Sequence, residues 1–185
     1  MMTGDLLAAK RRENIASYVI SMWHIEDLVR ACGFNVDLLL ERLLPDGTLT
    51  QQEVEATRGW YAGIMHRMQQ QGLERSGHLQ EVEEVINELE YLHQTLADVL
   101  HDEDYERLLA AAKPGIETLQ RQAGEDATGT VDTCFTAVYG VMLLRAKGSP
   151  VSEGTLEAEA AIRRLLERLS LHYRQMRKLP GVSMN

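Results

Sequence analysis

Length, composition and charge limit the kinds of protein that this sequence can encode. It has 185 residues, of which 44% are hydrophobic and 25% charged, as in a globular protein of one domain. Its formal net charge of -9 argues against a general nucleic-acid-binding protein, because phosphate contacts need clustered Lys and Arg. The most apolar run, residues 134–144, is far shorter than the roughly 20 residues that cross a bilayer, so no membrane partner is predicted.

The cysteines and the N-terminal residues predict a cytoplasmic protein. Cys32 and Cys134 are the only two cysteines, and they form neither a CxxC motif nor a zinc-binding spacing. The N-terminal residues MMTGDLLAAKRREN contain no apolar segment of a secretory signal. We therefore expect a reduced chain that depends on neither a disulfide nor a cofactor.

The first predicted helix covers residues 5–31 and ends at Gly33, a typical left-handed C-cap. At about 100° per residue, Glu26 falls within the apolar stripe of this helix, whereas His24 points to the opposite side. Arg30 lies one turn after Glu26, and this spacing predicts an internal ion pair between them. The alternative is a carboxylate in a cavity that binds a cation or acts as a base.

Two helices joined by a turn are predicted next. The first covers residues 35–44 and ends at the Pro-Asp-Gly turn of residues 45–47. The second runs from residue 50 to residue 72. It begins with a capping box, in which the hydroxyl of Thr50 and the carboxylate of Glu53 each accept a hydrogen bond from a free backbone N–H group.

Small residues gather on one face of the helix at residues 50–72. Ala56, Gly59 and Gly63 share this face. Glycine costs about 1 kcal/mol in a helix interior relative to alanine, so two glycines on one face predict the close approach of another helix. That helix belongs either to the same chain or to a partner in a homo-oligomer.

The fourth predicted helix, residues 77–100, carries a histidine in an apolar seam. His93 takes the place of an apolar residue in a regular three-four spacing. Glu90 lies one turn earlier and gives the Glu-x-x-His spacing of di-iron carboxylate bundles, so Glu90 and His93 are the candidate metal ligands. Those sites need a second such motif, which the chain lacks. The favoured alternative is a neutral core histidine that leucine could replace.

Three further helices complete the chain. The fifth begins at the acidic step that starts with Asp102 and is kinked or split at Pro114. The sixth, residues 130–147, is apolar on almost all sides, which is typical of a central helix. The seventh follows the cap residue Ser152 and runs to about residue 178.

These elements predict an all-α fold. Short connections place successive helices side by side, so we expect a single helical bundle of about six to seven helices around one central apolar helix. Period-two alternation, the sign of a strand, is absent along the sequence. The predicted domain organisation is one all-helical domain over residues 1–185.

Charge is distributed unevenly along the chain. Residues 74–106 contain eleven acidic side chains and Arg75 as their one Arg or Lys. Residues 145–178 contain eight Arg and Lys side chains and four acidic ones. The two segments are either solvated helix faces or surfaces that attract each other within or between chains.

Four segments carry a resemblance to a known family: KRRENIASYVISMWHIEDLVRA, GHLQEVEEVINELEYLH, AVYGVMLLRAKG and LLERLSLHY. They resemble an uncharacterised, all-helical bacterial family of the Bacteroidetes, a domain of unknown function. The resemblance covers nearly the whole chain. It implies a compact helical protein in the bacterial cytoplasm, and it implies no activity, substrate or site residue.

Two classes of function remain. The sequence contains no Gly-rich phosphate loop, GxSxG elbow or HExxH motif, which favours a non-enzymatic interaction or scaffold protein that self-associates. The alternative is a metal- or small-ligand-binding bundle, such as a hydrolase or an oxidoreductase. Its inner polar cluster would combine Glu26, Arg30, Glu90 and His93. Contact between Glu26 and His93 would favour this second class.

Overall fold

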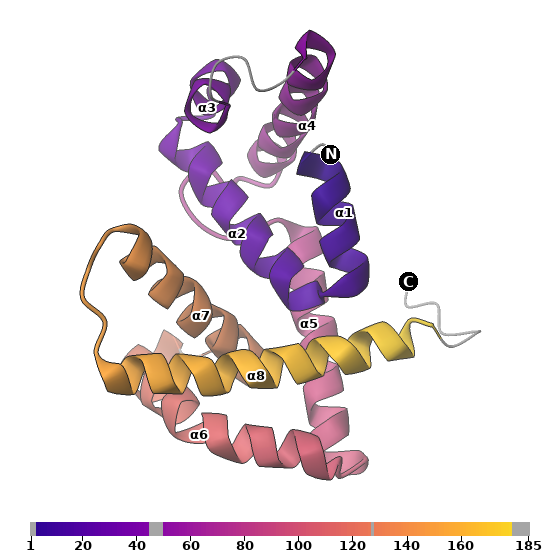
Figure 1. The fold of residues 1–185 in the computed structure, drawn as a ribbon, viewed down its shortest axis with the longest axis vertical. Helices are drawn as coiled ribbons and strands as arrows, with labels where there is room; N and C mark the ends of the chain where they lie inside the picture. Colours follow the sequence, from indigo (N-terminus) through magenta and orange to yellow (C-terminus); the bar gives the residue numbers. More distant parts are fainter. Residues whose placement is uncertain (1–2, 45–49, 127, 179–185) are drawn as a thin grey trace. The chain divides into compact units, whose positions relative to one another are not determined.

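The computed structural model describes residues 3–44, 50–126 and 128–178. Within these residues every regular element is a helix and no strand is present, which confirms the all-α fold. The predicted turn at residues 45–47 lies outside the described part of the chain. The elements, shown in Figure 1, are α1 (Thr3–Glu13), α2 (Ile15–Ala31), α3 (Val36–Leu43), α4 (Gln51–Gln70), α5 (Gln80–Gln94), the π-helix η1 (Thr95–Val99), α6 (Glu103–Ala123), the 3-10 turn η2 (Gly124–Asp126), α7 (Thr130–Ala146) and α8 (Glu153–Met176).

The chain forms two compact units. The first unit consists of Met1–Glu13 and Ser17–Glu84, and the second consists of Asn14–Ala16 and Val85–Asn185. A single domain over the whole chain stays a prediction, and the positions of the tryptophans make it testable.

Both tryptophans of the protein, Trp23 and Trp60, belong to the first unit. Tryptophan fluorescence therefore reports on the first unit, whereas far-UV circular dichroism reports on helices of both. If the chain is one cooperative domain, we expect the two signals to give the same midpoint in a urea titration. A fluorescence midpoint that differs from the circular dichroism midpoint would show that the units unfold separately and would contradict the prediction.

The first helical region is broken at Asn14, so the prediction of one helix over residues 5–31 is wrong. α1 ends at Glu13 and α2 begins at Ile15. The backbone N–H of Ala16, in the first turn of α2, donates to Oγ of Ser170 in α8 at 3.2 Å. A side chain 154 residues away therefore takes the place of an intrahelical acceptor, and Asn favours helix ends over helix interiors.

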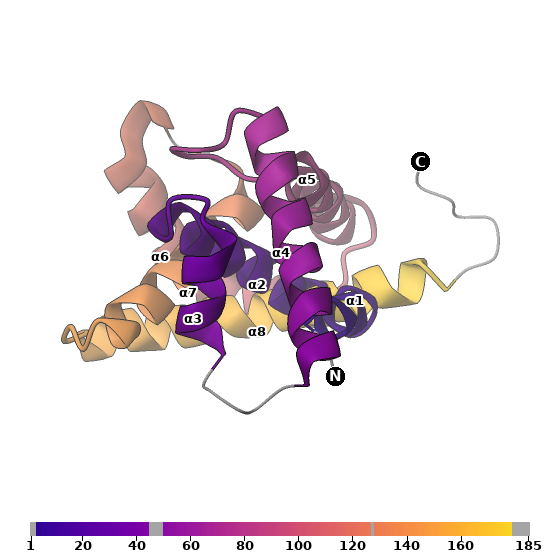
Figure 2. The same cartoon turned by 90° about the horizontal axis from the view of Figure 1, so that it is seen from above.

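In the first unit, α1 and α3 pack against α4, and α3 and α4 lie side by side in Figure 2. The predicted capping box at Thr50 and Glu53 is present at the start of α4. Gly4 of α1 lies directly against the indole of Trp60. A Cβ at position 4 would be 2.9 Å from Cδ1 of that ring, so α1 approaches α4 this closely because position 4 is glycine.

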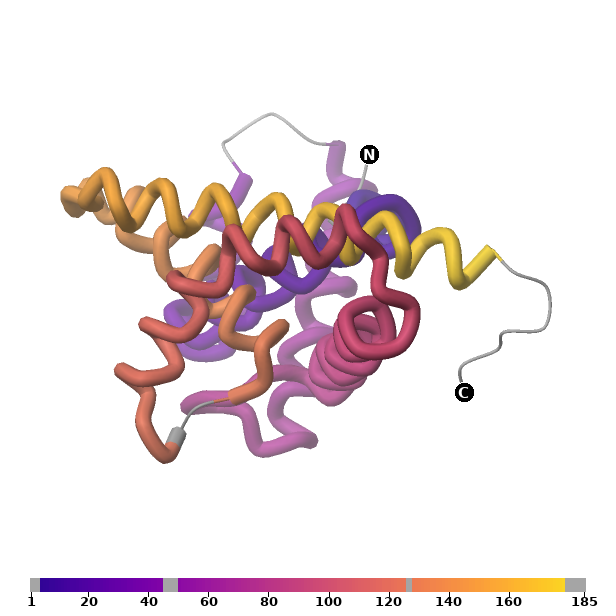
Figure 3. Tube along the Cα trace, turned by 90° about the horizontal axis from the view of Figure 1, so that it is seen from below, coloured from indigo at the N-terminus to yellow at the C-terminus, as the bar shows by residue number. Residues whose placement is uncertain are grey.

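In the second unit, α6 and α8 lie side by side and run in opposite directions, and α7 packs against both (Figures 1 and 3). A Cβ at Gly115 of α6 would be 3.1 Å from Cβ of Ala158 in α8. α6 continues through Pro114 and is not split there, and it packs along α8. Ser152 caps α8, as predicted, and α6 begins at the predicted acidic step, where Asp102 is the N-cap.

The apolar helix α7 supplies much of the core of the second unit. Most residues of its first three turns are buried or half-buried, with Thr136 exposed, whereas its last turn, from Leu144, is exposed. The prediction of a central apolar helix is therefore confirmed for the larger part of its length. Its buried residues are Val131, Thr133, Cys134, Phe135, Val138, Tyr139 and Val141. In the described part of the chain, no helix is both long and apolar enough to cross a bilayer.

The acidic and basic segments of the sequence meet in the second unit. Arg168 of α8 lies 3.4 Å from a carboxylate oxygen of Asp102 and 3.6 Å from one of Asp104. These contacts join the end of the acidic segment to the middle of the basic one. The interpretation that the two segments attract each other within the chain is confirmed at this place.

Candidate functional site

Glu26 is fully buried in the first unit, as predicted, and holds the start of α5. Its Oε2 lies 2.6 Å from Nδ1 of His78, and its Oε1 accepts from the backbone N–H of Leu79 at 3.0 Å. The His78 ring stacks on the indole of Trp23, with centroids 4.3 Å apart and planes 8° apart. Both carboxylate oxygens therefore have partners in the segment that leads into α5. His24 is exposed, as predicted.

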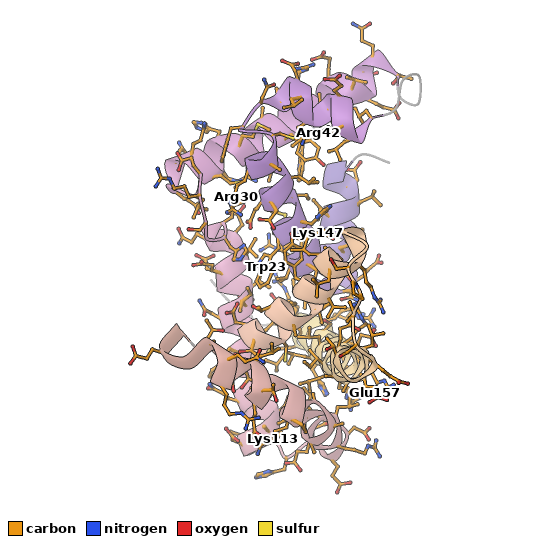
Figure 4. The ribbon with its side chains drawn as sticks, turned by 90° about the vertical axis from the view of Figure 1, so that its left-hand side faces the viewer. Trp23, Arg30, Arg42, Lys113, Lys147 and Glu157 are labelled. Carbon is orange, nitrogen blue, oxygen red and sulfur yellow. The ribbon has the colours of Figure 1, made fainter. Side chains whose placement is uncertain are left out.

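Arg30 is bound to the same connecting segment, and the predicted Glu26–Arg30 pair is wrong. Figure 4 labels Arg30 on α2. Its Nε donates to the carbonyl of Leu73 at 3.1 Å, its Nη2 donates to the carbonyl of Gly77, and its Nη1 lies 3.0 Å from Oδ1 of Asp27. Backbone carbonyls of a loop about 45 residues away in the sequence, which no helical spacing can reveal, occupy its donors.

In the second unit, Glu90 of α5 caps α7. The backbone N–H of Val131, in the first turn of α7, donates to Oε2 of Glu90 at 2.8 Å. The N-cap residue of α7 is Gly129, which has no side chain to do this. A negative charge at a helix N-terminus is also favourable for the helix dipole. The contact gives Glu90 a structural role.

His93 is buried and bonds to a fully buried tyrosine. Its Nδ1 lies 2.7 Å from the hydroxyl of Tyr105. Burial lowers the pKa of His93 although the charges of Glu90 and Asp98 raise it, and burial raises the pKa of Tyr105. Both pKa shifts favour the neutral forms, so the hydrogen bond joins an uncharged imidazole to an uncharged hydroxyl. His93 is a core histidine, as predicted, its lowered pKa favours the neutral form, and the tyrosine is a partner that the seam pattern did not reveal.

Cys134 of α7 is a buried, unreactive thiol. Burial, with the charge of Glu90 as a smaller cause, raises the pKa of the Cys134 thiol to about 12. The thiolate is the reactive form of cysteine, and this pKa keeps Cys134 protonated at neutral pH. Cys134 therefore adds no nucleophile beside Glu90 and His93.

The four candidate polar residues form two separate sets of structural contacts. Glu26 and Arg30 belong to the first unit, whereas Glu90 and His93 belong to the second, and each has partners within its own unit. Across residues 3–44, 50–126 and 128–178, no group of three or more His, Cys, Asp or Glu side chains could hold a metal ion. These contacts give no support to a metal site at Glu90 and His93.

The small-residue face of α4 is open. Ala56 and Gly59 are exposed, and a Cβ at Gly59 would meet no atom within 4 Å. A Cβ at Gly63 would meet only the side chain of Arg67, at 3.8 Å. Within the first unit, no other helix therefore packs closely against this face, and the close approach of another helix, from the same chain or from a partner, stays a prediction.

A groove with a volume of about 740 Å³ lies among α6, α7 and α8 in the second unit. Figure 4 marks these helices with Lys113 on α6, Lys147 just after α7, and Glu157 on α8. A Cβ at Gly140 or Gly154 would meet no atom within 4 Å, so the space beside these glycines is open. Small residues of the three helices form much of its wall: Gly115, Ala137, Gly140, Gly154 and Ala158.

The groove is mostly apolar, with polar groups at a few places. Glu159 is its buried carboxylate, and Arg163, one turn later on α8, contacts Oε1 of Glu159. Pockets of about 300–1,000 Å³ with apolar walls and few polar groups are typical of small-molecule sites. The remaining polar residues of the lining are Thr118, Gln122, Thr136, Ser152 and Thr155.

The groove was not predicted from the sequence, although it carries a visible signal. Gly140 lies within the most apolar helix, and Gly115 and Gly154 lie within the helices on either side of it. Glycine weakens a helix interior, so Gly115 and Gly140 carry the same signal as Gly59 and Gly63, whereas Gly154 lies in the first turn of α8. What the sequence could not show is that the three glycines face one common space.

Comparison with known proteins gives one match. A family model described as "Domain of unknown function (DUF4924)" matches residues 5–179. No curated protein and no solved structure matches the chain. The match confirms the resemblance to a family of unknown function, and the bacterial origin that the resemblance implied stays a prediction.

Proposed function

The chain belongs to the DUF4924 family, a domain of unknown function, and we propose that it is a non-enzymatic protein that binds a small ligand in the groove among α6, α7 and α8. The observation that carries this proposal is an open volume of about 740 Å³ with mostly apolar walls. The proposal keeps the ligand-binding alternative and moves it from the polar residues Glu26, Glu90 and His93 to this groove.

The glycines in the walls favour a binding role over a packing defect. Gly140 lies inside α7, where alanine would be more stable by about 1 kcal/mol, and Gly154 lies in the first turn of α8. Open space at both positions would accept a larger side chain. Residues that lower stability and keep a cavity open are typical of sites maintained for function. The described lining residues include no histidine or cysteine, so we propose binding and not catalysis.

The groove proposal is tested by filling the groove. We expect Gly140→Leu to abolish the binding of n-octanol, because the leucine side chain takes the space beside α7. Binding is measured by the saturable shift of the Gly115 and Gly154 amide signals in two-dimensional ¹H–¹⁵N NMR spectra. Gly33 and Gly72, which belong to the first unit, are internal references.

The matched control is Gly59→Leu, the same change at an open glycine within a helix of the first unit. It should leave n-octanol binding unchanged. Octanol binding that survives Gly140→Leu, or wild-type shifts spread over both sets of glycines, would contradict the groove proposal.

Self-association through the open face of α4 is a second candidate function. The observation that favours it is that a Cβ at Gly59, a glycine inside a helix, would meet no atom within 4 Å. A protein that pairs through this face would serve as an interaction or scaffold protein, the class that the sequence favours.

The same variant, Gly59→Leu, tests this candidate. We expect it to convert the homo-oligomer to a monomer while its far-UV circular dichroism stays unchanged, because a leucine fits the open face of the folded chain. Light scattering after size exclusion measures the mass. A wild-type protein that is already monomeric, or a variant that stays oligomeric, would exclude the α4 face as the interface.

A cytoplasmic, bacterial setting remains part of the proposal. Cys32 and Cys134 are both buried and free, which fits a reducing compartment. The net charge of -9 supports a partner other than nucleic acid.

A further inference from the structure

Glu159 is the one charged side chain among the described residues that line the groove. It is 7% exposed, and a buried carboxylate in apolar surroundings is unfavourable unless it is paired. Its partner is Nη2 of Arg163, whose side chain is 50% exposed. The carboxylate therefore lies at the groove, while its cation remains at the surface of α8.

Glu159 keeps acceptor capacity that the neighbouring hydroxyls lack. Arg163 contacts Oε1 alone, and a carboxylate has about four lone-pair positions. The hydroxyls of Ser152 and Thr155 bond to each other at 2.8 Å. The hydroxyl of Thr118 donates to a backbone carbonyl one turn earlier in α6, also at 2.8 Å. The strongest acceptor left for a ligand is Glu159.

We infer that the groove selects a ligand with an apolar body and a protonated amine, and that the amine binds Glu159. This inference rests on the proposed binding function of the groove. The apolar walls take the hydrocarbon part of the ligand out of water. The ammonium group donates a charge-assisted hydrogen bond to the carboxylate, which is stronger than a bond between neutral groups.

Three probes of equal length separate this inference from its alternatives. They are n-octylamine, n-octanol and n-octanoate, which present a cation, a neutral hydroxyl and an anion on the same chain. Their affinities for the wild-type protein are measured from the amide signals of Gly115, Gly140 and Gly154. We expect the amine to bind about tenfold more tightly than octanol, and octanoate to bind most weakly.

The matched variants are Glu159→Gln and Glu157→Gln. Both remove one negative charge from α8, but Glu157 is exposed and does not line the groove (Figure 4). Glu159→Gln should remove the tenfold preference for the amine and leave octanol affinity unchanged. Glu157→Gln should keep the preference, and a loss of preference there would mean that the net charge of the protein is the cause.

The wild-type series decides the inference even if Glu159→Gln does not fold. Equal binding of the amine and octanol would overturn the role of Glu159 and leave the groove proposal standing. Tighter binding of octanoate would also overturn it, and would indicate recognition by the N-terminus of α8 at Ser152. No saturable shift with any of the three probes would contradict both the inference and the proposed function.

Discussion

Replacing Glu26 with alanine is expected to lower the free energy of unfolding by about 3 kcal/mol. The carboxylate is fully buried and bonds both His78 and the backbone N–H of Leu79. Removing the carboxylate leaves the buried backbone N–H of Leu79 without an acceptor and releases the start of α5. The smaller side chain also leaves unfilled volume in the core. Urea denaturation followed by far-UV circular dichroism measures the change.

Glu106→Ala is the matched control for Glu26→Ala. Glu106 also pairs with a histidine, His101, but the two side chains are 44% and 70% exposed. Exposed pairs of this kind contribute little, so we expect a change within about 0.5 kcal/mol. In the Glu26→Ala background, His78→Ala should add less than it does alone, because the two side chains are coupled. Equal effects of the two glutamate variants would contradict the structural role of Glu26.

His93→Leu is expected to lower the free energy of unfolding by about 2 kcal/mol, because the variant leaves the buried hydroxyl of Tyr105 without its hydrogen-bond partner. The seam pattern alone predicted that leucine would be tolerated. Adding Tyr105→Phe removes that hydroxyl and should restore most of the loss, since exchanging both partners for apolar groups is nearly neutral. A single variant as stable as the wild type would show that the His93–Tyr105 bond contributes little.

The same histidine makes stability depend on pH. Burial lowers the pKa of His93 in the folded protein below its unfolded value of about 6.5, so folding favours the neutral form. The stability that His93 contributes in its neutral form is fully present above the unfolded pKa. It is lost as the pH falls through the unfolded pKa toward the folded pKa. Burial also lowers the pKa of His172, with Arg168 as a second cause. His93→Leu should therefore weaken the loss of stability below about pH 6.5 without abolishing it.

Local signals in the sequence predicted where helices begin. Thr50 and Ser152 each cap the helix that was expected to follow them, and α6 begins at the expected acidic step, because capping and dipole effects act over only a few residues. The burial of Glu26 was predicted for the same reason, since a helical stripe needs only the spacing within one helix.

Contacts between distant residues could not be predicted in this way. Glu26 bonds to His78 in place of Arg30, and Ser170 accepts from the N–H of Ala16 at the break before α2. In both cases helical spacing predicts the direction of a side chain and not what lies opposite it. The groove was missed for the same reason, because its walls come from three helices.

Glu90 and Gly129 are expected to change together in evolution. The backbone of position 129 has an ordinary N-cap conformation, with φ −57° and ψ 166°, where Ser, Thr or Asp would normally be favoured. A Cβ there would lie 2.7 Å from Oε2 of Glu90, so the carboxylate already occupies the space of a side chain. Relatives that keep the glutamate should keep the glycine, and relatives that have lost it should carry a capping residue at position 129.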